Sequence, residues 1–157
     1  MLGLTLGLFV LPVQLWLALA PRSVLRDHVE ARSLAAAALL ALALPLVQIV
    51  LQVRELGGPA VRGNRVGFPA EAGAGGRIGR AHRNLVEGLV PFAAAVSAAQ
   101  ALGVSNAQTV GAAALFLVAR LAHAISYAAG VTVLRSAAFY AGLIATTILA
   151  LQLPLLR

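Results

Sequence analysis

The sequence predicts an all-α integral membrane protein. Hydrophobic residues make up 61% of the chain and charged residues only 11%, whereas about a quarter of the residues of soluble domains are charged. Five apolar stretches are long enough to cross the hydrocarbon layer as a helix, which takes about 20 residues. None of them alternates apolar and polar residues, so helices are expected rather than barrel strands. Together these observations exclude a soluble globular domain.

The first expected helix carries a feature that resembles a cleavage site. It ends in Ala18-Leu19-Ala20, as a signal peptide would, but no positively charged segment precedes it and Pro21 follows directly. We therefore interpret it as a retained helix. The five expected membrane-crossing helices are 2–20, 34–53, 85–102, 107–129 and 137–156.

The segments between these helices differ in composition. Residues 21–33 form a charged connector, and residues 54–79 are rich in glycine and proline, which predicts turns. Shorter turns are expected at 103–106 and 130–134. The sequence shows no internal repeat, and we expect an extra N-terminal helix with its connector (1–33) followed by a four-helix domain (34–157).

The basic charge indicates a membrane protein rather than a nucleic-acid-binding protein. The net charge is +7 and all twelve basic residues are arginine, but the chain lacks the solvated length on which a nucleic-acid binder gathers such residues. The positive-inside rule favours the long loop in the cytoplasm, because seven arginines lie on its side and four on the other. The two sets are Arg54, Arg62, Arg65, Arg77, Arg80, Arg83 and Arg135, and Arg22, Arg26, Arg32 and Arg157.

Two clusters of polar residues interrupt the apolar stretches. Arg80, Arg83, Asn84 and Glu87 lie just before and at the start of the third expected helix, and helical spacing places them on one face. A carboxylate inside an apolar helix costs about 2.5–3.5 kcal/mol unless it is paired. Glu87 is therefore expected to contact Arg83, Arg80 or a cationic group of a ligand.

The second cluster lies on the fourth expected helix and at the start of the fifth. Arg120, His123 and Tyr127 form one stripe, and Arg135-Ser136 follow. Each residue alone also has an ordinary structural interpretation: an ion pair between Arg120 and Glu87, an interhelical hydrogen bond from His123, or an interfacial aromatic at Tyr127.

Taken together, the motifs resemble those of the MAPEG family, the membrane-associated proteins in eicosanoid and glutathione metabolism. The resemblance rests on Arg80-Ala-His-Arg-Asn-x-x-Glu87 with Pro91-Phe92, on Arg120-x-x-His-x-x-x-Tyr127, and on Arg135-Ser136. It implies a homotrimer of four-helix protomers that binds glutathione between adjacent protomers near the cytoplasmic face. It also implies that glutathione is held by Arg54, Arg80, Arg83, Asn84, Glu87, Arg120, His123 and Tyr127, with Arg135 and Ser136 beside its thiol.

The residue types suit that ligand. Arginine forks match the two carboxylates of glutathione, and Glu87 matches its ammonium. The Arg135 cation would favour thiolate, and Ser136 would donate a hydrogen bond. The chain has no cysteine, so a reactive sulfur must come from the substrate, and no metal is implied.

The resulting hypothesis is a membrane enzyme that activates the glutathione thiol for transfer to a lipophilic electrophile or hydroperoxide that diffuses in from the bilayer. The alternative is a non-catalytic membrane scaffold or accessory subunit with the same fold, in which the N-terminal helix docks a partner. A small transporter is disfavoured, because the polar residues gather near one membrane face rather than at the midplane.

Overall fold

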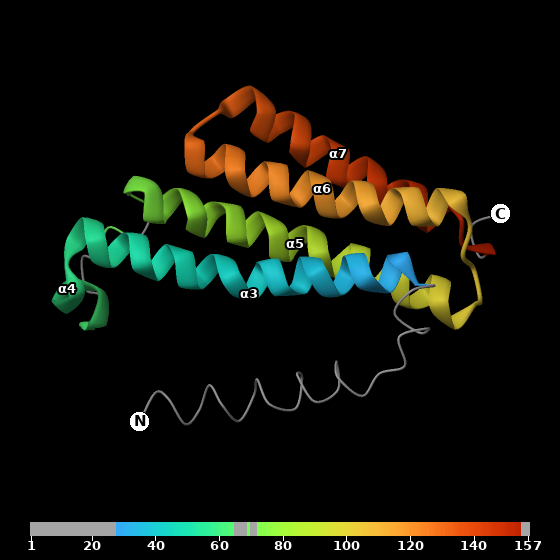
Figure 1. The fold of residues 1–157 in the computed structure, drawn as a ribbon, viewed down its shortest axis with the longest axis horizontal. Coiled ribbons are helices and arrows are strands. Elements are labelled where there is room, and N and C mark those ends of the chain that lie inside the picture. The colour runs from blue at the N-terminus through green and yellow to red at the C-terminus, as the bar shows by residue number, and fades with distance from the viewer. Residues whose placement is uncertain (1–27, 65–68, 70–71, 155–157) are drawn as a thin grey trace.

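The long helices of the protein form an antiparallel bundle (Figure 1). The computed structural model describes residues 28–64, 69 and 72–154. Within these ranges the helices are α3 (Val29–Leu56), α4 (Gly58–Arg62), α5 (Gly73–Ala101), α6 (Ala107–Ala129) and α7 (Thr132–Leu151). No strand occurs in this part of the chain, and the all-α prediction is confirmed. The expected helix 2–20, residues 21–27 of the connector and Arg157 lie outside the described residues.

The bundle consists of two helical hairpins packed on one another. Helix α3 packs against α5, α6 packs against α7, and α6 also contacts both α3 and α5. Helix α4, the start of α5 and the α6–α7 turn lie at one end of the bundle, and the α5–α6 turn lies at the other (Figure 1).

The expected bounds of α6 agree with the structure at both ends, whereas α3, α5 and α7 begin earlier than expected. Helix α7 starts at Thr132 rather than at residue 137, and the α6–α7 turn is correspondingly shorter. A search for charge-free stretches stops at Arg135, but a charged residue in the first turn of a helix does not interrupt the backbone hydrogen bonds. Gly130, at φ 75° in the left-handed region, ends α6 and reverses the chain.

The glycine-rich segment was expected to form turns, and that expectation is wrong for α4 and for the start of α5. A Cβ atom added to Gly75 would lie 2.6 Å from Cγ of Gln52, and one added to Gly79 would lie 2.8 Å from Nε2 of Gln48. These glycines therefore lie at the contact of α5 with α3. Small residues spaced by four bring membrane helices close together, so the glycines serve helix packing here.

The start of α5 is capped by a side chain from α3. The carboxylate of Glu55 accepts hydrogen bonds from the backbone N–H groups of Ala74 at 2.8 Å and Gly75 at 3.3 Å. The N-cap residue Ala72 supplies no side-chain cap of its own. Glu55 thus satisfies two of the free N–H groups at the start of α5 and places a negative charge at the positive end of its dipole.

A buried carboxylate ties the opposite end of the bundle together. Glu30 is 4% exposed, and its carboxylate accepts hydrogen bonds from the hydroxyls of Thr109 at 2.6 Å and Ser105 at 2.9 Å. Glu30 was assigned to the connector, but it belongs to the first turn of α3. It joins α3 to the start of α6, where Asn106 and Thr109 form a capping box.

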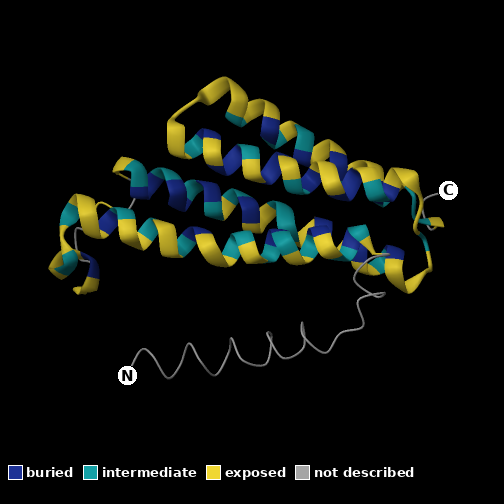
Figure 2. Ribbon diagram, in the orientation of Figure 1, coloured by how far each residue is buried: buried dark blue, intermediate teal, exposed yellow. Residues whose placement is uncertain are grey.

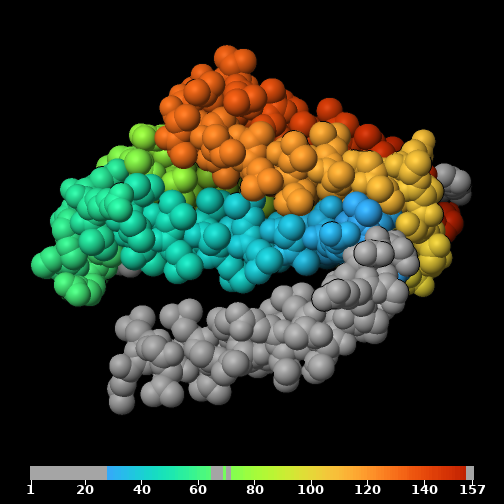
Figure 3. Space-filling view, in the orientation of Figure 1, coloured from blue at the N-terminus to red at the C-terminus, as the bar shows by residue number. Residues whose placement is uncertain are grey.

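The surface of the bundle is largely apolar. Leu42, Val90 and Val118 are 70%, 67% and 62% exposed, and exposed residues cover the outer faces of the helices (Figure 2). The space-filling view shows these outer faces over α3 and α6 (Figure 3). Of the helices described, α3, α6 and α7 are long and apolar enough to cross a membrane. The protein is therefore an integral membrane protein.

Candidate functional site

A cavity of about 190 Å³ lies between α5, α6 and α7. Helix α5 contributes one residue to its lining, α6 two, and the first turns of α7 the others. The lining residues are Asn84, His123, Tyr127, Arg135, Ser136, Phe139 and Tyr140. Because the short α6–α7 turn returns α7 directly along α6, the polar start of α7 faces the polar last turns of α6.

Helical spacing explains which side chains meet at this cavity. His123 and Tyr127 are one turn apart on α6, with ring centroids 5.1 Å apart in an edge-to-face arrangement. On α7, Phe139 lies one turn after Arg135 and on the same face, and its ring centroid is 6.3 Å from that of His123.

Arg135 contacts both ring-bearing residues of α6 that line the cavity. Its backbone carbonyl oxygen lies 3.0 Å from Nδ1 of His123, and its guanidinium carbon lies 4.9 Å from the centroid of the Tyr127 ring. A carbonyl oxygen can only accept, so Nδ1 of His123 carries the hydrogen. The other ring nitrogen, Nε2, is buried and has no hydrogen-bond partner among the described residues.

Arg120 lies inside the bundle behind the cavity and does not line it. Its side chain is 3% exposed, and Nη1 donates a hydrogen bond to Oδ1 of Asn84 at 2.9 Å. Its guanidinium carbon lies 4.9 Å from the centroid of the Phe116 ring, which stacks on Phe92 at 3.8 Å. Nε of Arg120 is buried and has no hydrogen-bond partner within the part of the chain that the structure describes.

The structure brings half of the site residues proposed from the sequence together. Asn84, His123, Tyr127, Arg135 and Ser136 line one cavity, and Arg120 contacts it through Asn84. The hydroxyl of Ser136 donates to the carbonyl oxygen of Thr132 at 3.2 Å.

The remaining proposed residues do not line this cavity: Arg54, Arg80, Arg83 and Glu87. Asn84 is half-buried, whereas Arg83 and Glu87 are exposed. The face that these residues share covers about 100° of the helix, so its two edges meet different surroundings: Asn84 lies toward α6 and Arg83 lies outside. Arg120 binds Asn84 rather than forming the ion pair with Glu87 that was considered.

Sequence reasoning missed two kinds of residue. Tyr140 lines the cavity, and its position one turn after Ser136 was the signal that could have identified it. Gly88 and Gly142 lie against the guanidinium of Arg120, and nothing in the sequence marks these two glycines apart from the others.

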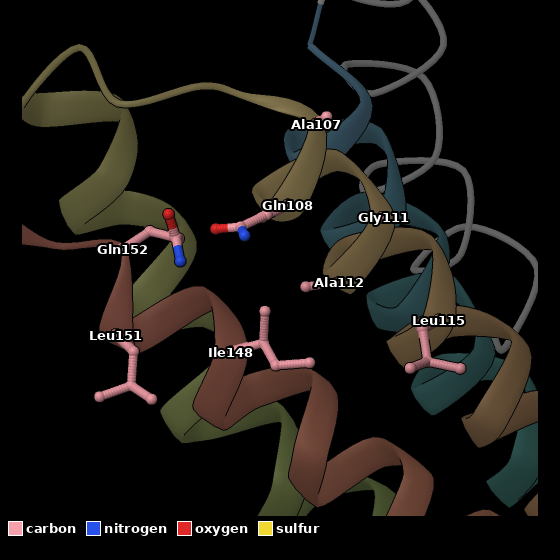
Figure 4. A pocket seen from close by; sticks show the side chains of 8 residues that line it. All are labelled: Ala107, Gln108, Gly111, Ala112, Leu115, Ile148, Leu151 and Gln152. Atoms are coloured by element: carbon pink, nitrogen blue, oxygen red, sulfur yellow. The ribbon is translucent and has the colours of Figure 1, made fainter.

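A second cavity, of about 440 Å³, lies at the opposite end of the hairpin formed by α6 and α7. Figure 4 shows Ala112 and Ile148 from the two helices at this cavity, with Gln108 and Gln152 near one another at the helix ends. Its lining is mainly apolar and carries no charged side chain. Of these two cavities, the one between α5, α6 and α7 is therefore the one lined by a charged side chain, Arg135.

Comparison with known proteins identifies the fold. Residues 33–154 match the MAPEG family. This range contains α5, α6 and α7 in full and nearly all of α3. A search of curated proteins and a search of solved structures each gave no match. The chain belongs to the MAPEG family.

Proposed function

We propose that this MAPEG protein is a membrane-embedded glutathione-dependent enzyme that activates the glutathione thiol for transfer to a lipophilic electrophile or hydroperoxide. The observation that carries the proposal is the cavity between α5, α6 and α7, in which the Arg135 cation, the Ser136 hydroxyl and the Asn84 amide line one space. A cation, two donors and a buried acceptor at His123 suit a ligand with carboxylates, amides and a thiol.

In this proposal Arg135 and Ser136 act on the thiol. A thiol with a pKa of about 8.5 is mostly protonated at neutral pH, and a fixed cation beside it lowers the pKa by favouring thiolate. Ser136 donates to Thr132 in the structure, and rotation of its side chain would redirect the hydroxyl to sulfur. The thiolate then supplies the electron pair that attacks the electrophile.

A homotrimer would complete the site. Arg83 and Glu87 are exposed on α5 of the single protomer, outside the cavity. A ligand bound between adjacent protomers would contact both the cavity of one protomer and these side chains of the next. Arg54 and Arg80 are assigned to the same shared site, with the Glu87 carboxylate on the ligand ammonium.

Thiol transfer and hydroperoxide reduction suit the cavity better than isomerase chemistry. The motifs resemble those of microsomal prostaglandin E synthase, and some members of the family carry a tyrosine one turn after the Arg-Ser pair. Here that position is Phe139, which lines the cavity without a hydroxyl. The lipophilic substrate would enter from the bilayer, and the arginine-rich loop between α3 and α5 would face the cytoplasm.

Calorimetry and ultraviolet absorbance test the proposal. Detergent-purified protein is titrated with glutathione, thiolate absorbance is followed, and conjugation of a generic hydrophobic electrophile is assayed. Binding with thiolate formation and conjugation supports the enzyme. Binding without thiolate favours the non-catalytic scaffold, and absence of binding contradicts glutathione dependence.

A further inference from the structure

The guanidinium of Arg120 is enclosed by two glycines on neighbouring helices. A Cβ atom added to Gly88 of α5 would lie 2.8 Å from Nη2 of Arg120, and one added to Gly142 of α7 would lie 2.7 Å from the same atom. Both separations are too short for a carbon atom to occupy. Arg120 reaches from α6 into a space that exists only because both neighbouring residues lack a side chain.

Within the described part of the chain, no carboxylate neutralises the charge of the enclosed guanidinium. Its hydrogen-bond partner is the neutral amide of Asn84, and one face of the guanidinium covers the Phe116 ring. A buried charge without an opposite charge is costly. Asn84 lines the cavity whereas Arg120 does not, so Arg120 contacts the cavity lining through Asn84.

The hydrogen bond also fixes the orientation of the Asn84 amide. A guanidinium can only donate, so the atom that faces Arg120 must be the carbonyl oxygen Oδ1. The amide nitrogen Nδ2 then remains for other partners. Asn84 consequently offers donors, polarised by a neighbouring cation, to whatever occupies the cavity.

We propose that Arg120 is a positioning residue: held between Gly88 and Gly142, it orients Asn84 so that Nδ2 donates to a carboxylate or carbonyl oxygen of the ligand. This proposal rests on the proposed function, because it names how one part of the glutathione site is prepared. It assigns Gly88 and Gly142 to ligand binding although neither touches the ligand.

Alanine substitutions test this arrangement with the guanidinium still present. In Gly88→Ala and Gly142→Ala the new methyl group would push aside the flexible end of Arg120, while the helix backbone is retained. Loss of the charge-assisted hydrogen bond from Arg120 to Asn84 should weaken glutathione binding about tenfold, as measured by calorimetry. Gly111→Ala on α6 is the matched control, because nothing lies within 4 Å of its added Cβ, and its affinity should equal that of the wild type.

A double-mutant cycle separates this role from simple packing. If the glycines act through Arg120, Gly88→Ala should have no further effect on affinity in an Arg120→Leu background. Additive losses would overturn the proposal, as would unchanged affinity in both glycine variants. The glycine variants keep the test decisive should Arg120→Leu fail to fold.

A readout without ligand distinguishes failure of this inference from failure of the proposed function. The chain contains three asparagines, Asn64, Asn84 and Asn106, so asparagine-selective ¹⁵N labelling gives few side-chain amide signals, and Asn84→Ala identifies the relevant one. That signal should move in Gly88→Ala and Gly142→Ala and stay in place in Gly111→Ala. An unmoved signal refutes the role of Arg120, whereas absence of glutathione binding by the wild type refutes the proposed function.

Discussion

The backbone carbonyl oxygen of Arg135 accepts a hydrogen bond from Nδ1 of His123 at 3.0 Å. This contact joins the first turn of α7 to the last turns of α6, and it requires that Nδ1 carry the hydrogen. Nε2 of the neutral ring is then an acceptor, and it is buried with no hydrogen-bond partner in residues 28–64, 69 and 72–154. In the proposed site this nitrogen would accept from an N–H or thiol group of the ligand.

Replacing His123 should therefore weaken ligand binding without removing the link between α6 and α7. In His123→Asn the shorter amide can still donate to Arg135, but the acceptor at Nε2 is lost. We expect the Kd for glutathione to rise roughly three- to tenfold, the effect of about one neutral hydrogen bond. Calorimetry provides the measurement, with His82→Asn as the control because His82 does not line the cavity. Equal affinities for the two variants would leave His123 with a structural role only.

Removing the long-range helix cap should destabilise the protein. Glu55→Ala leaves the N–H groups of Ala74 and Gly75 without their acceptor, and loss of a helix cap costs about 0.5–2 kcal/mol. We expect a lower unfolding temperature in detergent for Glu55→Ala. Glu87→Ala is the control, since Glu87 is exposed in the middle of α5, and it should change the temperature less. Equal shifts would show that the cap contributes nothing measurable.

Helix ends that carry local sequence signals could be predicted, whereas a helix start that depends on tertiary contacts could not. Helix α6 has a hydrophobic stretch with Asn106 as its cap and Gly130 at its end, so both ends follow from sequence signals. The start of α5 has glycines that favour turns in isolation. It is helical because Glu55 caps it and because its glycines pack on Gln48 and Gln52, contacts that lie about twenty or more residues away in sequence.

The candidate site shows the same limit. Spacing placed His123 and Tyr127 on one face of α6, and the structure confirms this. Spacing also placed Glu87 with Asn84 on α5, but it could not indicate which edge of that face meets α6. The side of a helix on which a neighbour packs is a tertiary property. Where a helix face consists of a few adjacent polar residues, the hydrophobic pattern alone does not indicate which of them faces the neighbour.

Glu87 provides a test of assembly. If the site is shared between protomers, the protein should be a trimer in mild detergent by native mass spectrometry, and harsh detergent should remove ligand and trimer together. Glu87→Gln keeps the size of the side chain and removes its charge, so glutathione affinity should fall about tenfold or more, given roughly 1.5–3 kcal/mol for a charged hydrogen bond. Monomers that bind glutathione with wild-type affinity would contradict the shared site.

Arg135 is the residue at which binding and chemistry should separate. If its guanidinium mainly stabilises thiolate, Arg135→Leu should change glutathione affinity only modestly and lower turnover steeply. The cation interacts more strongly with a sulfur anion than with a neutral thiol, so its removal raises the pKa of the bound thiol. Each unit of that rise represents about 1.4 kcal/mol of lost differential stabilisation. Less thiolate is then present at neutral pH, and the activity profile should move to higher pH.

The measurement is the ultraviolet absorbance of the thiolate against pH for glutathione bound to wild type and to Arg135→Leu, alongside conjugation of a generic hydrophobic electrophile. Arg83→Leu is the matched control, because it removes an arginine that is exposed outside the cavity: it should weaken binding while leaving the pKa of the bound thiol unchanged. If Arg135→Leu and wild type titrate the thiol alike, the guanidinium over Tyr127 serves the packing of α7 on α6 and the assigned mechanism is wrong. If the wild type binds glutathione but never forms thiolate, the cavity holds the tripeptide without activating it, as the scaffold alternative requires.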